Sequence, residues 1–276
     1  MKSVMTFSRR RATVVLALLA VSVAMPSVAR SAADQQADHS RRPAWQFAVT
    51  DDSRAAGCKD ASNPAASAQY NGGSTVVMGA IARDIAAHGV DFVLFPGDMI
   101  TGEVDDSAAV SSMLGTWMAT MAPVYDAGIP VYVTRGNHEY NPKTNGSVNV
   151  LDPSRQPFLD HFDYLPHNGP TGEKGLTYAI THKNVKVIGF DQYANRSASY
   201  DNHLYAPGSN AWQTMNPWVI DEVNSSNAPL TFVMAHEQIW PTVSHSDCLA
   251  NDPTARDALV HALASRGTIT CTSAAT

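Results

Sequence analysis

The stretch VTRGNHEYNP, residues 133–142, joins a β-branched run to a glycine and then to Asn137, His138 and Glu139. One interpretation is a simple turn, because glycine and asparagine tolerate turn backbones and Pro142 would end the loop. The other interpretation is that a strand delivers three polar side chains to one point, where a metal ion or an anion is held. The residues that follow the other strand-like segments favour the second interpretation.

The length and composition indicate a globular chain. With 276 residues there is room for one large domain or two small ones. Hydrophobic residues make up 44% of the chain and charged residues only 16%, so the chain can bury a sizeable core and is not disordered throughout.

Residues 1–33 have the pattern of a signal peptide. A basic start, with Lys2 and the arginines at 9–11, precedes the apolar run 12–25, which is too short and too alanine-rich for a comfortable membrane span. Small residues for cleavage follow, and the arginine run also resembles a twin-arginine signal. We expect an exported protein, periplasmic or extracellular, with no stable membrane span after cleavage; an uncleaved anchor is the alternative.

The charge left after cleavage argues against nucleic-acid binding. Residues 1–33 hold five of the 19 basic residues and no acidic residue, which leaves 14 basic against 25 acidic side chains and a formal charge of −11. Such a surface repels phosphate backbones, so we expect no general nucleic-acid binding. A local positive site can still hold a small anionic substrate. The cysteines fit no zinc-binding spacing, and pairing of Cys58 with Cys248 is left open.

Strand-like and helix-like segments alternate after a polar leader at 34–44, which predicts a layered α/β core with parallel segments in a domain covering 45–276. Strands are expected at 45–50, 91–96, 129–135, 175–182, 184–191 and 230–236, with a hairpin joining the fourth and fifth. Helices are expected at 74–89, 107–128, 210–226 and 252–267.

Polar residues follow four of the expected strands. Asp52 follows the first, Asp98 the second, Asn137 and its neighbours the third, and His236 the last. Each has a structural alternative when taken alone, as a cap, a turn residue or a core histidine. Because sites in layered α/β proteins form beyond the carboxyl ends of strands, we expect these side chains to meet. Oxygen and nitrogen ligands without thiolate suit manganese, zinc or iron.

Four motifs in this order resemble the calcineurin-like metallophosphoesterases, a family that includes the purple acid phosphatases. They are TDDSR (50–54), FPGDMI (95–100), RGNHEY (135–140) and VMAHEQ (233–238), and the resemblance extends over about residues 45 to 267. It implies a layered sandwich of mixed sheets flanked by helices. It also implies a phosphoesterase that hydrolyses small phosphate esters with a hydroxide activated by two divalent or trivalent ions of Mn, Fe or Zn.

The resemblance also implies a role for each residue of the motifs. Asp52 would bind the first metal ion and Asp98 would bridge both, whereas Asn137 and His236 would bind the second. His138 would stay off the metals and protonate or stabilise the leaving oxygen. Glu139 would orient its neighbours from outside the ligand set.

Three departures from the family pattern stand out. Arg54 occupies the position of the histidine in Asp-x-His; it cannot bind a metal, and either forks onto a substrate phosphate oxygen or forms a structural ion pair. Thr101 stands where purple acid phosphatases have a tyrosine ligand. The closing Gly-His-x-His motif is absent.

The absent closing motif indicates a truncation, with a frameshift near Gly267 as one hypothesis. We therefore expect the C-terminal strands to be missing, the edge of the sheet to be exposed, and hydrolysis to be weak or absent. The alternative function is a non-catalytic secreted binding domain that keeps the fold with a degraded metal site. A serine hydrolase is disfavoured because the sequence has no Gly-x-Ser-x-Gly.

Overall fold

The structure is a computed structural model, and its chain divides into Met1–Pro43 and Ala44–Thr276. It describes residues 45–54, 71–102, 104, 106–140, 152–193, 216–240 and 252–266, and the backbone of 269–272. The predicted signal peptide and leader, and both Cys58 and Cys248, lie outside these residues. Within the described segments, no helix has the length and hydropathy needed to cross a membrane.

The first sheet contains three parallel strands, in the order β1, β2, β3. Its strands are β1 (Phe47–Val49), β2 (Phe92–Phe95) and β3 (Val131–Val133). The connections are helical: α3 (Thr75–His88) joins β1 to β2, and α4 (Ser107–Thr120) with α5 (Ala122–Asp126) joins β2 to β3. Parallel neighbours require such crossovers, so the predicted alternation of strands and helices is confirmed.

The second sheet is mixed, with four strands in the order β4, β5, β6, β7. A tight hairpin pairs β4 (Tyr178–His182) with β5 (Val185–Gly189) in antiparallel orientation, as predicted. Parallel pairing continues to β6 (Leu230–Ala235) and β7 (Ile269–Thr272). The helices α8 (Asn216–Asn224) and α9 (Pro253–Ser265) precede β6 and β7.

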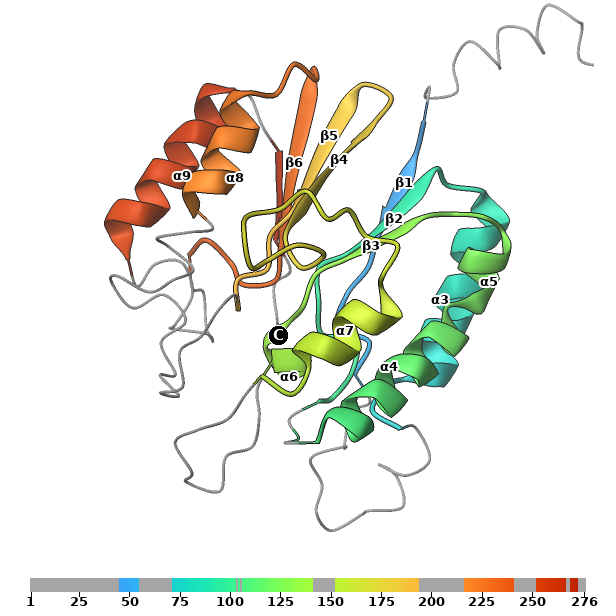
Figure 1. The fold of residues 1–276 in the computed structure, drawn as a ribbon. Coiled ribbons are helices and arrows are strands. Elements are labelled where there is room, and N and C mark those ends of the chain that lie inside the picture. Colours follow the sequence, from blue (N-terminus) through green and yellow to red (C-terminus); the bar gives the residue numbers. More distant parts are fainter. Residues whose placement is uncertain are drawn as a thin grey trace, which may run out of the picture. The chain divides into compact units, whose positions relative to one another are not determined.

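The two sheets pack face to face, with helices on both outer faces (Figure 1). The alternation along β6 shows this arrangement: Phe232 and Met234 join the core between the sheets, whereas Val233 and Ala235 pack towards α8 and α9. All four residues of β2 are buried, as expected for a parallel strand covered on both faces. The predicted layered α/β sandwich of mixed sheets flanked by helices is confirmed.

One expectation about the C-terminal strands was wrong. The strand after the last helix is present, because β7 pairs with β6 over Phe232↔Ile269 to Ala235↔Thr272. The β-branched residues of this segment suit a strand. The backbone of β7 pairs with the edge of β6 that we expected to be exposed.

Two helical segments also differ from the prediction. The expected helix at 107–128 is divided into α4 and α5, with Pro123 in the first turn of α5, because proline removes a backbone donor and clashes inside a helix. The expected loop after Glu139 contains α7 (Arg155–His161), while the GNHE stretch itself forms the short helix α6 (Asn137–Tyr140).

Candidate metal centre

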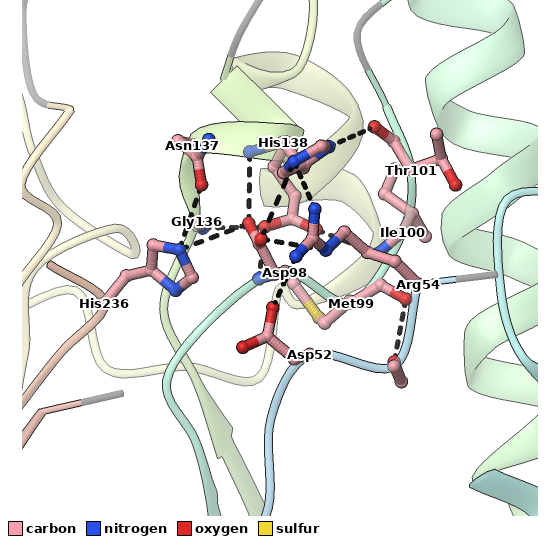
Figure 2. Close-up of polar contacts among 12 residues, drawn as sticks. Asp52, Arg54, Asp98, Met99, Ile100, Thr101, Gly136, Asn137, His138 and His236 are labelled. Carbon is pink, nitrogen blue, oxygen red and sulfur yellow. Dashed lines mark hydrogen bonds and ion pairs between the residues drawn. The ribbon is translucent and has the colours of Figure 1, made fainter. Parts of the chain in front are cut away.

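The predicted site residues meet at one end of the two sheets, beyond the carboxyl ends of β1, β2, β3 and β6. Figure 2 shows Asp52 after β1, Asp98 after β2, Asn137 and His138 in α6 after β3, and His236 after β6, with their polar groups pointing towards one another. Four segments far apart in the sequence therefore converge at one point.

The backbone at this point is unusual. Asp52 and Asp98 have φ values of 49° and 54°, in the left-handed region that only aspartate and asparagine among the non-glycine residues adopt readily. The strand is followed by glycine at position 136 because a Cβ atom there would lie 2.1 Å from Asp98 Oδ1 and 2.4 Å from Asp98 N. The glycine lets the loop after β3 approach the loop after β2 closely enough for the two to share hydrogen bonds.

Glu139 ties these two loops together. Its carboxylate is buried and accepts hydrogen bonds from the backbone N–H groups of Gly136 (2.7 Å), Asp98 (2.9 Å) and Ile100 (3.0 Å). Burial, with the nearby negative charge of Asp98, raises the pKa of Glu139 to about 7. Its position suits the orienting role that the resemblance implies.

His236, Asn137 and Asp98 present three electron-pair donors to one another. His236 Nδ1 lies 3.0 Å from the carbonyl oxygen of Pro96, which only accepts, so this nitrogen carries the ring proton. In the neutral imidazole, His236 Nε2 then turns a lone pair towards Asn137 Oδ1 at 3.0 Å and Asp98 Oδ1 at 3.4 Å. Asp98 and His236 are buried and Asn137 is half-buried, and this set of carboxylate, amide and imidazole donors suits a divalent metal ion.

Arg54 occupies the other side of Asp98. Its Nε lies 3.0 Å from Asp98 Oδ2, and its Nη2 donates to Asp52 Oδ1 at 3.0 Å. Nη1 contacts His138 Nε2 (Figure 2). Burial raises the pKa of Asp98 well above its usual range, and the positive charge of Arg54 opposes that rise.

His138 lies on the Arg54 side of Asp98, with Nε2 4.0 Å from Asp98 Oδ2. Its Nδ1 lies 2.9 Å from the carbonyl oxygen of Thr101, so Nδ1 donates and Nε2 accepts a hydrogen bond from Arg54. The hydroxyl of Thr101 donates to the carbonyl of Gly72 at 3.0 Å and supplies no ligand in place of the tyrosine of purple acid phosphatases. The role of His138 towards a leaving oxygen stays a prediction.

The donors therefore fit one of the two metal ions that the family pattern implies. Asp98 Oδ1, Asn137 Oδ1 and His236 Nε2 fit the second ion. Asp52 and Asp98 Oδ2, expected for the first ion, face the guanidinium of Arg54 instead. Within the described part of the chain, no three His, Cys, Asp or Glu side chains lie close enough together to hold a metal ion. The amide of Asn137 is therefore a necessary member of the donor set.

Sequence reasoning did not find the buried ion pairs behind this centre. Arg135, directly before Gly136, is fully buried and donates from Nε and Nη2 to Asp191 at 3.1 and 2.6 Å. It also contacts the carboxylate of Asp152 and donates to Ser154 Oγ at 3.1 Å. The signal available in the sequence was an arginine at the end of a buried strand, which requires a buried partner for its charge.

A profile of the family described as "Calcineurin-like phosphoesterase" matches residues 72–263, which is more than half of the chain. The chain belongs to the calcineurin-like phosphoesterases. Membership confirms the family resemblance found from the motifs and places the chain among the phosphoesterases. The matched range contains Asp98, Asn137 and His236 and begins after Asp52 and Arg54.

Two solved structures are similar to this chain at low sequence identity. A dimetal phosphatase from Danio rerio is 15% identical, with a TM-score of 0.50 over 83% of this calcineurin-like chain and 87% of that chain. A purple acid phosphatase from yellow lupin (Lupinus luteus) seeds is also 15% identical, with a TM-score of 0.48 over 72% of this chain. The match spans 32% of the lupin chain. No curated protein matches the sequence.

Proposed function

We propose that this chain is an exported metal-dependent phosphoesterase that hydrolyses small phosphate esters. The observation that carries the proposal is the convergence of three donor atoms: His236 Nε2 lies 3.0 Å from Asn137 Oδ1 and 3.4 Å from Asp98 Oδ1. Family membership supports the reaction class, and the pattern of residues 1–33 supports export. The acidic balance of the remaining chain supports a small substrate rather than a nucleic acid.

The metal chemistry and the protein chemistry have separate parts. A divalent or trivalent ion of Mn, Fe or Zn at this centre supplies Lewis acidity, which polarises a phosphoryl oxygen and makes hydroxide available near neutral pH. Asp98, Asn137 and His236 would hold the ion, while the carbonyl of Pro96 keeps the imidazole in the tautomer that presents Nε2. Asp52 accepts a hydrogen bond from Arg54, and its role as a metal ligand stays a prediction.

Two residues would act on the substrate. Arg54 supplies a positive charge beside Asp98, which favours a phosphate group at the exposed side of the centre. His138 would hold a proton for the leaving oxygen on Nε2. Because Nε2 accepts from Arg54 in the structure, Arg54 has to release the imidazole before that proton can be carried there.

The test is a phosphatase and phosphodiesterase panel on the purified full chain, with p-nitrophenyl phosphate and bis-p-nitrophenyl phosphate and with Mn²⁺, Zn²⁺ or Fe³⁺ added to metal-stripped protein. We expect hydrolysis that needs added metal and is lost in Asp98→Asn and His236→Ala. Asp84→Asn, which removes an exposed carboxylate on α3, should behave like the parent protein.

The outcomes separate this proposal from the alternative function. Metal-dependent hydrolysis that survives in both centre variants would place the chemistry elsewhere. Metal binding without hydrolysis of either ester would favour the alternative function, a non-catalytic secreted binding domain.

A further inference from the structure

The position of the guanidinium of Arg54 bears on the number of metal ions. The family pattern surrounds the first ion with Asp52, Asp98 and the histidine of Asp-x-His. In this chain Arg54 replaces that histidine, and its nitrogens lie 3.0 Å from both carboxylates. The positively charged group therefore stands between the two oxygens that the first ion would need.

We propose that Arg54 takes the place of the first metal ion, so that the centre consists of one bound metal ion and one guanidinium that share Asp98. This inference rests on the proposed function, which requires a metal centre, and it specifies the composition of that centre. Asp98 retains its bridging position, with Oδ1 directed to the metal donors and Oδ2 directed to Arg54.

The contact between Arg54 and Asp98 has the character of a charge pair. Arg54 Nε and Asp98 Oδ2 are both buried and lie 3.0 Å apart, yet neither makes an aligned hydrogen bond. A buried carboxylate oxygen without a hydrogen bond is expensive unless a cation neutralises it. The guanidinium supplies that charge here, as a metal ion would in the family pattern.

The backbone holds Arg54 at this place. Arg54 pairs with Gly73 in an isolated antiparallel bridge, and the preceding Ser53 is buried, donating from Oγ to the carbonyl of Met99 at 2.8 Å. Trp117 Nε1 in turn donates to Ser53 Oγ at 3.0 Å. The bridge to Gly73 and the buried Ser53 therefore hold the main chain of Arg54 where its side chain contacts both Asp52 and Asp98.

Charge balance favours a single metal ion beside the guanidinium. Asp52, Asp98 and the buried Glu139 behind Asp98 contribute at most three negative charges, whereas Asn137 is neutral. Arg54 and one divalent ion already match those three charges. A second divalent ion would add two more positive charges within a few ångströms, where Coulomb repulsion is strong.

The first experiment measures metal bound per chain. Full-length protein stripped by a chelator is dialysed to equilibrium against graded Mn²⁺, and bound manganese is measured by elemental analysis. We expect the parent chain to bind one ion, His236→Ala to lose it, and Asp52→Asn to keep it. If Asp52→Asn loses the ion and His236→Ala keeps it, the ion is bound on the side of Asp98 that faces Asp52, and the inference is overturned.

The second experiment changes Arg54 itself. Arg54→His restores the Asp-x-His spacing and provides a third ligand beside Asp52 and Asp98, so we expect a second bound ion and a spin-coupled manganese spectrum in place of an isolated one. Arg54→Lys keeps the positive charge and should remain at one ion. If Arg54→His does not fold by circular dichroism, Arg54→Ala replaces it, with a weaker second site expected. A folded variant without the cation that still binds one ion contradicts the inference.

The measurements also distinguish failure of this inference from failure of the proposed function. Two ions per parent chain, together with metal-dependent hydrolysis, overturn the inference alone. One ion per parent chain without hydrolysis of any ester in the panel overturns the proposed function alone. No bound ion in the parent chain overturns both.

Discussion

Glu139 offers the sharpest test of how the centre is held together. Its carboxylate accepts three backbone hydrogen bonds, from Gly136, Asp98 and Ile100, and so joins the loop after β2 to the loop after β3. Glu139→Ala removes all three bonds at once and leaves three buried N–H groups without their acceptor. The two loops that carry Asp98 and Asn137 then lose their shared support.

The geometry sets the size of the expected loss. A hydrogen bond to a charged group contributes about 1.5–3 kcal/mol, and a buried donor left without an acceptor costs a similar amount. Water entering the space left by the side chain satisfies part of this demand, so we expect Glu139→Ala to lower the free energy of unfolding by about 3–6 kcal/mol. Glu139→Gln keeps one acceptor oxygen and turns an N–H group towards the remaining donor, so its loss should be about 1–3 kcal/mol.

Urea denaturation followed by tryptophan fluorescence measures these differences, since Trp117 is buried in the core beside the centre. The matched control is Asp84→Ala, which removes a carboxylate that is 76% exposed on α3 and should change stability by no more than about 0.5 kcal/mol. The reasoning fails if Glu139→Ala lies within about 1 kcal/mol of the parent protein.

Two further predictions concern a glycine at the centre and an ion pair away from it. Gly136→Ala should weaken metal binding severely, because its Cβ would collide with Asp98 Oδ1. The control Gly79→Ala lies in helix α3, where the added Cβ makes ordinary contacts, and it should stabilise the chain by about 0.5–1 kcal/mol. Equilibrium dialysis measures metal binding by the two variants, and urea denaturation measures their stability. The hydrogen bond from Lys183 lowers the pKa of Asp91 to about 2 from 3.8. The stabilisation that Asp91 gives the fold should therefore be complete above pH 3.8 and lost as the pH falls towards 2. Asp91→Asn should flatten that part of the profile of stability against pH.

The fold was readable from the sequence where pattern and turn chemistry agree. Gly89 ends α3 in the left-handed conformation with a φ of 61°, and Asp252 caps α9 by accepting from Ala255 N; both residue types are typical of these positions. Ser74 precedes α3 but makes no side-chain cap. The break between α4 and α5 was missed because the apolar pattern runs through Pro123, and periodicity does not register a missing backbone donor.

The centre was predictable in its membership and less so in its pairings. Strand ends identified Asp52, Asp98, Asn137 and His236, because sites in layered α/β proteins form beyond the carboxyl ends of strands. The backbone carbonyls that fix the imidazole tautomers are not visible in a list of side-chain types. The direction of Arg54 was equally hidden, since it depends on the left-handed backbone of Asp52 and on the bridge to Gly73.

A cation that is part of the chain has consequences that a bound ion does not. The guanidinium of Arg54 is always charged and does not dissociate, so the buried oxygen Asp98 Oδ2 stays neutralised at any free metal concentration. Only the donors around His236 then depend on metal supply, and hydrolysis should rise with added metal along a single-site curve. A second binding phase in that titration would show that Arg54 gives way to another ion, and the buried charge pair would then be only a resting arrangement of the centre.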